Sequence, residues 1–254
     1  MRPILSVLAL IIFLCPAQQA SAQCADSIAA RLDGSATACP RLRPAEVAVP
    51  AAIVAFTAYT ARNGWLRKKR DVVQDALSPR NGIHTRIDNY IQYAPLAAGV
   101  ALNLAEHDRL DRIGVQVLGM ATMTLLTQGL KHTVRERRPD TDARNSFPSG
   151  HTATAFLGAE LLRMQSSHIS PWIGYSGYAV AAATAYLRIY NNRHYLNDVL
   201  GGAAIGFFSA RFAAWAYPRI FRRGACRRTA GATVACMPFA ADGGGYGACL
   251  SVTF

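Results

Sequence analysis

The chain has 254 residues, of which 51% are hydrophobic, and it carries a formal net charge of +12 at pH 7. A chain of this length suits one domain, or one membrane bundle with short appendages. Nucleic-acid binding would call for one basic stripe interleaved with aromatic residues, which is missing, so the composition instead indicates a membrane protein with basic flanks.

The first 22 residues are typical of a secretory signal peptide. Arg2 supplies the positive start, residues 4–15 form the apolar stretch, and residues 20–22 (Ala-Ser-Ala) form a small-residue cleavage site. The apolar stretch is too short to span a membrane comfortably, which argues against an uncleaved anchor. We therefore expect residues 23–45 to form a periplasmic N-terminal segment of a bacterial type of protein.

Cleavage after residue 22 would leave five cysteines, an odd number that cannot pair fully within one chain. The spacing allows local disulfides between Cys24 and Cys39 and between Cys236 and Cys249, if those segments face an oxidising compartment. No C-x-x-C spacing is present. We therefore predict neither a zinc site nor a redox site.

Six apolar segments follow the signal, and they predict an all-α membrane bundle with a helical core over residues 46–217. Most are rich in Ala and Gly, as in helices that pack closely in a membrane, and Gly202 and Gly206 form a small-residue pair in the last segment. Several segments are short or contain Thr and Gln, so a wholly soluble helical bundle is the alternative. The segments run over residues 46–61, 90–106, 113–130, 150–165, 171–187 and 196–217.

Two polar stretches lie outside these segments. Residues 62–89 form a polar connection with a cationic cluster that we interpret as a solvated flank. The cluster consists of Arg62, Arg67, Lys68, Lys69 and Arg70. Residues 218–254 form a basic tail, in which alternating stretches at 232–240 and 246–254 predict a small β-hairpin. We predict no catalytic chemistry in this tail.

His194 and Asp198 are four residues apart, so on a helix they would lie on one face. The carboxylate could then accept a hydrogen bond from one imidazole nitrogen and leave the other free as a nucleophile. Taken alone, such a pair is more often an ordinary surface pair. Arg188, at the end of the preceding apolar segment, favours a functional interpretation because its guanidinium can face the same pocket.

The tetrapeptide Pro148-Ser149-Gly150-His151 opens the fourth apolar segment. Proline and serine suit the start of a helix, where the first backbone N–H groups are unpaired and bind anions readily. We expect Ser149 and the Gly150 amide to hold phosphate oxygens, and His151 to reach a leaving oxygen. On its own, the tetrapeptide would be interpreted as a plain helix cap followed by a core histidine.

Lys131 and Arg138 are the remaining candidates for phosphate binding. The planar guanidinium of arginine matches two phosphate oxygens, while lysine adds a compact positive charge. Phosphoryl transfer depends mainly on positioning and charge neutralisation, which these two cations and Arg188 could supply without a metal. A positively charged membrane flank would explain this stretch on its own, and we assign His132, Arg135 and Arg137 to such a flank.

Together these stretches resemble the three-part signature of the type 2 phosphatidic acid phosphatase superfamily, which is Lys-x6-Arg-Pro, Pro-Ser-Gly-His and Ser-Arg-x5-His-x3-Asp. The superfamily includes membrane lipid phosphatases, soluble bacterial acid phosphatases and vanadium haloperoxidases. The one departure is Leu187, which stands where the signature has serine. The resemblance implies a six-helix membrane bundle of this superfamily's kind over residues 46–217.

The resemblance also implies a division of roles. His194 would attack phosphorus and become phosphohistidine, Asp198 would orient it, and His151 would protonate the leaving alcohol and then activate water. Neither a metal nor another cofactor is implied. The implied phosphate-binding residues are Lys131, Arg138, Ser149, Gly150 and Arg188.

We therefore predict a lipid phosphate phosphatase that acts on a lipid of the lipid A, undecaprenyl pyrophosphate or phosphatidylglycerophosphate type. Its expected partners are the membrane and the lipid phosphate, with no nucleic acid and no obligate protein partner. A soluble periplasmic acid phosphatase of broad specificity is the alternative. The chain is short for a haloperoxidase, and an intact nucleophile, acid and carboxylate argue against a non-catalytic lipid-phosphate-binding protein.

We expect a multi-pass protein of the bacterial inner membrane, with the site facing the periplasm. After signal cleavage, three full crossings would instead place Lys131 on the cytoplasmic side. An outward-facing site is therefore expected only if residues 46–61, which are few and contain Pro50, lie on or dip into the membrane.

Overall fold

The structure is a computed structural model that describes residues 40–78, 85–104, 109–221, 233–241 and 245–253. The described chain divides into a helical unit up to Tyr217 and a second unit that contains the C-terminal strands, and each is described by itself. The predicted signal peptide and the pair Cys24 and Cys39 lie outside the described residues.

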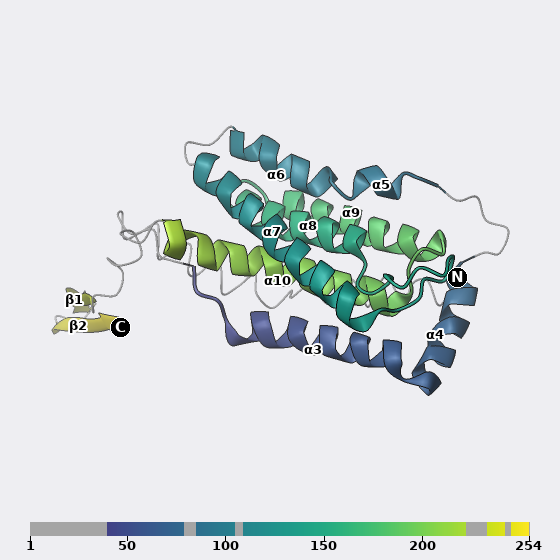
Figure 1. Ribbon diagram of the computed structural model, residues 1–254. Helices are drawn as coiled ribbons and strands as arrows, with labels where there is room; N and C mark the ends of the chain where they lie inside the picture. Colours follow the sequence, from purple (N-terminus) through teal and green to yellow (C-terminus); the bar gives the residue numbers. More distant parts are fainter. Residues whose placement is uncertain (1–39, 79–84, 105–108, 222–232, 242–244, 254) are drawn as a thin grey trace. The chain divides into compact units, whose positions relative to one another are not determined.

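The helical unit confirms the all-helical core but not the number of helices (Figure 1). Each predicted apolar segment corresponds largely to one long helix, and the prediction left out α4 and the short α5. The helices are α3 (Pro44–Arg62), α4 (Gly64–Leu77), α5 (Asp88–Ile91), α6 (Ala94–Leu104), α7 (Arg109–Val134), α8 (Gly150–Ser166), α9 (Pro171–Tyr190) and α10 (Leu196–Phe221).

Helix α4 lies within the stretch that we predicted to be a polar connection. Its N-cap residue Asn63 accepts hydrogen bonds from the backbone N–H groups of Trp65 and Leu66, which satisfies two of the unpaired donors of the first turn. The buried residues Arg70, Gln74 and Leu77 are four and three apart, so they form one face of the helix. The solvated-flank interpretation is therefore wrong for Arg70.

The core of the helical unit is built around α8, which is buried along most of its length and packs against α6, α7 and α9. The close approach of α8 to α10 depends on two glycines of α10. A Cβ at Gly202 would overlap the Ser149 carbonyl oxygen, and one at Gly206 would overlap the Ala153 carbonyl oxygen. The predicted small-residue pair is thus the surface on which α10 meets the backbone of α8.

Replacement of Gly206 by alanine is expected to lower the Tm of the protein in detergent micelles. The added Cβ has no room beside Ala153, so α8 and α10 must separate, at a cost of about 1–3 kcal/mol. Gly129→Ala on α7 is the matched control, because a Cβ there meets nothing within 4 Å. Equal Tm values for the two variants would contradict the packing described here.

Three helices, α3, α7 and α10, are long and apolar enough to cross a membrane. The apolar side chains of α3 and α7 are mostly not packed inside the helical unit, and Val117 and Leu125 of α7 are 64% and 74% exposed. Apolar surface of this extent indicates a membrane protein. Helix α3 has 19 residues despite Pro50, so shortness is no reason to expect it to stay at the surface.

The second unit contains β1 (Thr233–Ala241) and β2 (Gly245–Thr253), which pair antiparallel. In their register, Cys236 pairs with Leu250 and Cys249 pairs with Met237. The two cysteines for which we considered a local disulfide are therefore not directly opposite each other.

Candidate active site

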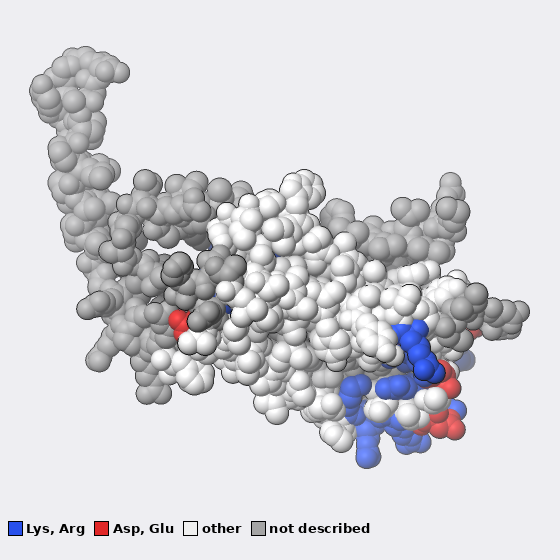
Figure 2. All heavy atoms as spheres, turned by 90° about the horizontal axis from the view of Figure 1, so that it is seen from above, with Lys and Arg blue, Asp and Glu red and all other residues white. Residues whose placement is uncertain are grey.

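The three motif stretches meet at one end of the helical unit. Lys131 lies in the last turn of α7, Arg188 lies in the last turn of α9, and Asp198 lies in the first turn of α10. Figure 2 shows one face of the molecule, on which the visible lysine and arginine side chains gather at one end while most of the face carries no charge. The exposed cations on the elements that meet at this end are Arg62, Arg67, Lys68, Lys69, Arg135, Arg137, Arg144 and Arg193.

His194 and Asp198 form the buried centre of this site, together with a serine. The His194 Nδ1 lies 3.5 Å from Asp198 Oδ2 and 3.4 Å from Ser146 Oγ. The Ser146 hydroxyl donates a hydrogen bond to the same Asp198 oxygen. These neighbours favour the imidazole tautomer with its proton on Nδ1, which leaves Nε2 with a free lone pair.

The two residues do not both lie on a helix, as their spacing had predicted. His194 lies in the turn that joins α9 to α10, where its backbone N–H donates to the Arg188 carbonyl oxygen. Asn192 has a φ of 55° in this turn, a left-handed conformation that asparagine tolerates better than most residues. The predicted contact therefore forms through a tight turn rather than through helical stacking.

The pKa of His194 is held well below its usual value. Burial of the side chain is the main cause, and the positive charges of Arg188, Lys131 and Arg138 add to it. The folded protein therefore favours the neutral imidazole. A neutral imidazole is the form that can act as a nucleophile.

The three predicted cations differ in their partners. Lys131 Nζ donates to the Asn145 carbonyl oxygen at 2.6 Å, and Arg188 Nη1 donates to Asp88 Oδ2 at 2.7 Å. The Nε atoms of Arg138 and Arg188 are buried and find no acceptor among the described residues. Buried N–H donors need an acceptor, and oxygens of a bound phosphate would provide one.

The start of α8 differs from the prediction in one respect. The Ser149 amide donates to the Asp198 carbonyl oxygen, so it is not available to an anion. The Ser149 side chain is fully buried, and its Oγ accepts a hydrogen bond from Thr152. The amides of Gly150 and His151 belong to the first turn of α8, where no intrahelical acceptor exists, and they remain suited to bind an anion.

Helix α5 supplies two partners of site residues that the sequence analysis did not identify. Asp88 forms a buried ion pair with Arg188, and Asn89 Oδ1 lies 2.9 Å from His151 Nε2. If Nε2 carries the proton of this hydrogen bond, the Nδ1 of His151 is left to exchange a proton with a ligand. These partners lie 100 and 62 residues from the motif residues, so no spacing rule could have revealed them.

A second buried layer supports the turn that carries His194. Arg70 of α4 pairs with Glu136, and Asn197 donates to the other Glu136 oxygen at 3.1 Å. The Arg70 guanidinium also stacks on the ring of Tyr195, 3.5 Å from its centroid. The Tyr195 backbone N–H in turn donates to Asp198 Oδ2 at 3.0 Å. Arg70 is thus linked through Tyr195 to the carboxylate beside His194.

Burial and the nearby Asp198 carboxylate raise the pKa of Glu136 to about 8, against the opposing effect of Arg70. A raised pKa means that the folded protein binds this proton more tightly than the unfolded chain does. The associated stability is complete below about pH 4.5 and is lost as the pH rises towards 8.

Glu136→Gln is therefore expected to flatten the pH dependence of stability. The amide imitates the protonated carboxyl, so it removes the titration and keeps one acceptor oxygen on the side of Arg70 or of Asn197. Between pH 5 and 8, the Tm of the wild type in micelles should fall relative to the Tm of the variant. Parallel curves across this range would show that Glu136 does not titrate there.

The described residues contain no group of three or more His, Cys, Asp or Glu side chains that could hold a metal ion. The donor set of the site is instead cationic, with Lys131, Arg138 and Arg188 around a neutral histidine. Such a set is suited to a phosphate group and unsuited to a divalent cation. The fold and this site together define a helical membrane protein with a buried cationic centre at one end of its helical unit.

Comparison with known proteins finds a family match over the residues of this site. Residues 113–222, which contain all three motif stretches, match the model of the PAP2 superfamily. A lipid A 1-phosphatase from Porphyromonas gingivalis is 41% identical over 144 residues, which are 55% of this chain and 32% of that protein. The match thus spans about a third of the length of this relative.

Two solved structures are similar to this one. A transmembrane PAP2-type phosphatidylglycerolphosphate phosphatase from Bacillus subtilis aligns with a TM-score of 0.52 and 20% identity, over 68% of this chain and 98% of that one. Aquifex aeolicus LpxE aligns with a TM-score of 0.45 and 23% identity, over 56% and 92% of the two chains. The first likeness shows a shared helical fold.

Proposed function

We propose that this protein is a membrane lipid phosphatase that hydrolyses a phosphate monoester or pyrophosphate on a lipid through a phosphohistidine intermediate. The observation that carries the proposal is the buried His194, whose Nδ1 lies beside Ser146 and Asp198 at the centre of a site with three cations. The name of the Porphyromonas gingivalis relative, a lipid A 1-phosphatase, supports a lipid substrate.

The reaction would proceed in two displacements. His194 Nε2 attacks phosphorus while the bond to the leaving alcohol oxygen breaks, and His151, as the imidazolium with protons on both nitrogens, gives that oxygen its Nδ1 proton. Burial and the nearby cations lower the pKa of His151 to about 4, so the negative charge of the bound phosphate would have to favour this protonated form. Water then attacks the phosphohistidine and passes a proton to His151, which restores both histidines and releases inorganic phosphate. The transferred group would be held by Lys131, Arg138 and Arg188, together with the Ser149 hydroxyl and the Gly150 amide.

Phosphate release from a panel of lipids tests this proposal. The purified protein in micelles would be given lipid A, undecaprenyl pyrophosphate, phosphatidylglycerophosphate and phosphatidate, with p-nitrophenyl phosphate as a soluble comparison. We expect release from at least one lipid, inhibition by vanadate and no inhibition by EDTA. Release from the soluble ester alone would favour the broad-specificity acid phosphatase, and complete inhibition by EDTA would overturn the metal-free mechanism.

We place the site at the periplasmic face of the bacterial inner membrane. With an exported N-terminus, this placement requires α3 to lie on or dip into the membrane, although the helix is long and apolar enough to cross it. Labelling of Thr141→Cys with a membrane-impermeant thiol reagent in intact cells tests this, because Thr141 is exposed in the loop beside the site. Ser146, although nearer to His194, is buried and would not report accessibility. Protection of the introduced cysteine until cells are lysed would place the site in the cytoplasm.

A further inference from the structure

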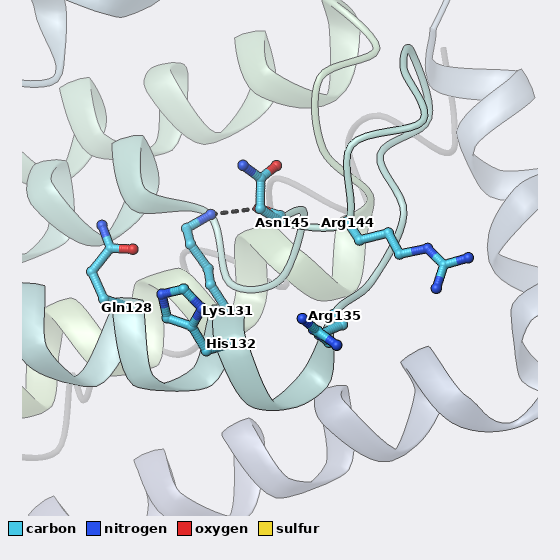
Figure 3. Close-up of a pocket in the computed structure, with 6 residues that line it drawn as sticks. All are labelled: Gln128, Lys131, His132, Arg135, Arg144 and Asn145. Atoms are coloured by element: carbon cyan, nitrogen blue, oxygen red, sulfur yellow. Dashed lines mark hydrogen bonds between the residues drawn. The ribbon is translucent and has the colours of Figure 1, made fainter.

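A basic pocket of about 410 Å³ adjoins the phosphate site at the C-terminal end of α7 (Figure 3). Lys131 belongs to both, since it lines the pocket and its charge also acts on His194. The lining contains amides and cations but no carboxylate. It consists of Gln128, Lys131, His132, Arg135, Arg144 and Asn145.

The positive charge of this pocket is not balanced within the part of the chain that the structure describes. The two aspartates of the neighbouring loop are engaged elsewhere, Asp140 with Arg193 at 2.7 Å and Asp142 with Arg137. Neither Arg135 nor Arg144 forms an ion pair with a described carboxylate. The flank interpretation given to His132 and Arg135 therefore does not describe their place, because both face a hollow that is suited to an anion.

The exposed face of α7 shows what kind of molecule would bring that anion. Val117, Ala121 and Leu125 are exposed and four residues apart, and the same face continues through Gln128 to His132. This face belongs to a helix that is long and apolar enough to cross a membrane. An apolar stripe that ends in a cationic pocket matches an amphiphile, with acyl chains along α7 and an anionic headgroup at its end.

We propose that this pocket binds a second anionic group of the substrate lipid, a phosphate or phosphodiester in the same headgroup as the phosphate to be removed. Arg135 and Arg144 would then determine specificity, because their guanidinium groups recognise phosphate oxygens in pairs. The inference rests on the proposed lipid phosphatase function. It adds that lipids with two anionic headgroup positions are preferred over those with one.

Two lipids with identical acyl chains test the inference. Phosphatidate carries only the phosphate monoester, while phosphatidylglycerophosphate carries a phosphodiester as well. For Arg135→Gln/Arg144→Gln we expect kcat/KM on phosphatidylglycerophosphate to fall about tenfold, as for the joint loss of two exposed charge contacts, with the value on phosphatidate nearly unchanged. Arg67→Gln/Lys68→Gln removes the same charge from the exposed face of α4 and should change neither value.

Each other outcome counts against the inference. Wild-type efficiency of the double variant on both lipids would remove the pocket from substrate recognition, while leaving the phosphatase function intact. An equal loss on both lipids would assign the arginines to the scissile phosphate or to stability. If the double variant has a lower kcat/KM than the wild type on phosphatidate, but only after phosphatidylglycerol is added, a neighbouring lipid supplies the anion that the pocket binds. Hydrolysis of neither lipid by the wild type would refute this inference, whereas the proposed function would fail only if lipid A and undecaprenyl pyrophosphate also released no phosphate.

Discussion

His194→Ala is expected to lower kcat/KM for phosphate release by at least about a thousandfold, the size seen when a covalent nucleophile is removed. No other neutral, buried imidazole lies between Asp198 and the three cations in the described part of the chain. The fold should survive, because Ser146 can still donate to Asp198. Activity and Tm of the two proteins, measured in the same micelles, check both parts of this expectation.

Ser146→Ala is the companion variant, since it removes a neighbour of His194 Nδ1 but leaves the nucleophile in place. Its kcat/KM should fall only about tenfold, the effect of one lost hydrogen bond at the site. Phosphate release by His194→Ala at the wild-type rate would refute the assignment of the nucleophile. A Tm collapse confined to His194→Ala would instead give that residue a structural role.

Arg70→Ala is expected to reduce the free energy of unfolding by about 3 kcal/mol and to lower kcat with little change in KM. Removal of one partner of a buried pair normally costs more, but Glu136, whose pKa is raised to about 8, is already largely protonated at neutral pH and leaves little uncompensated charge. The kcat effect has a separate cause. Without the stacked guanidinium, the Tyr195 ring loses its support, and the Tyr195 N–H holds Asp198.

Arg67→Ala is the control for both effects. Arg67 is exposed on the same helix, so its replacement should change neither the free energy of unfolding nor kcat. Arg70→Lys should restore only part of the stability, since an ammonium group cannot both pair with Glu136 and stack as a planar group on Tyr195. Thermal unfolding in micelles and steady-state kinetics distinguish the three variants. Wild-type kinetics in Arg70→Ala would show that the contacts of Arg70 with Glu136 and Tyr195 are not needed for the function of the site.

The sequence was informative where local signals and motif residues coincide. The apolar segments predicted the long helices, and the spacing of His194 and Asp198 predicted a contact that does form, although through a turn. The cationic stretch from Arg67 to Arg70 was misjudged because composition does not tell which of four adjacent cations faces inward. The helical spacing of Arg70, Gln74 and Leu77 carried that information.

Other features depend on the folded chain and could not be predicted. The Ser149 amide is engaged because α10 brings the Asp198 carbonyl oxygen against the start of α8, and this depends on the close packing at Gly202. Asp88 and Asn89 occupy a four-residue helix whose sequence gives no sign of its partners. Contacts between distant segments are set by the packing of whole helices.

The positions of Arg70 and Asp88 in the sequence show how much of the chain must fold together to form the site. Both residues precede residue 113, where the PAP2 match begins, yet each has its buried partner inside the match, Glu136 for Arg70 and Arg188 for Asp88. A fragment cut at the edge of the match would retain every motif residue but lose Arg70, the partner of Glu136, and Asp88, the counter-charge of the motif residue Arg188. The stretch that matches the family model is thus shorter than the stretch of chain that must fold together to form the site.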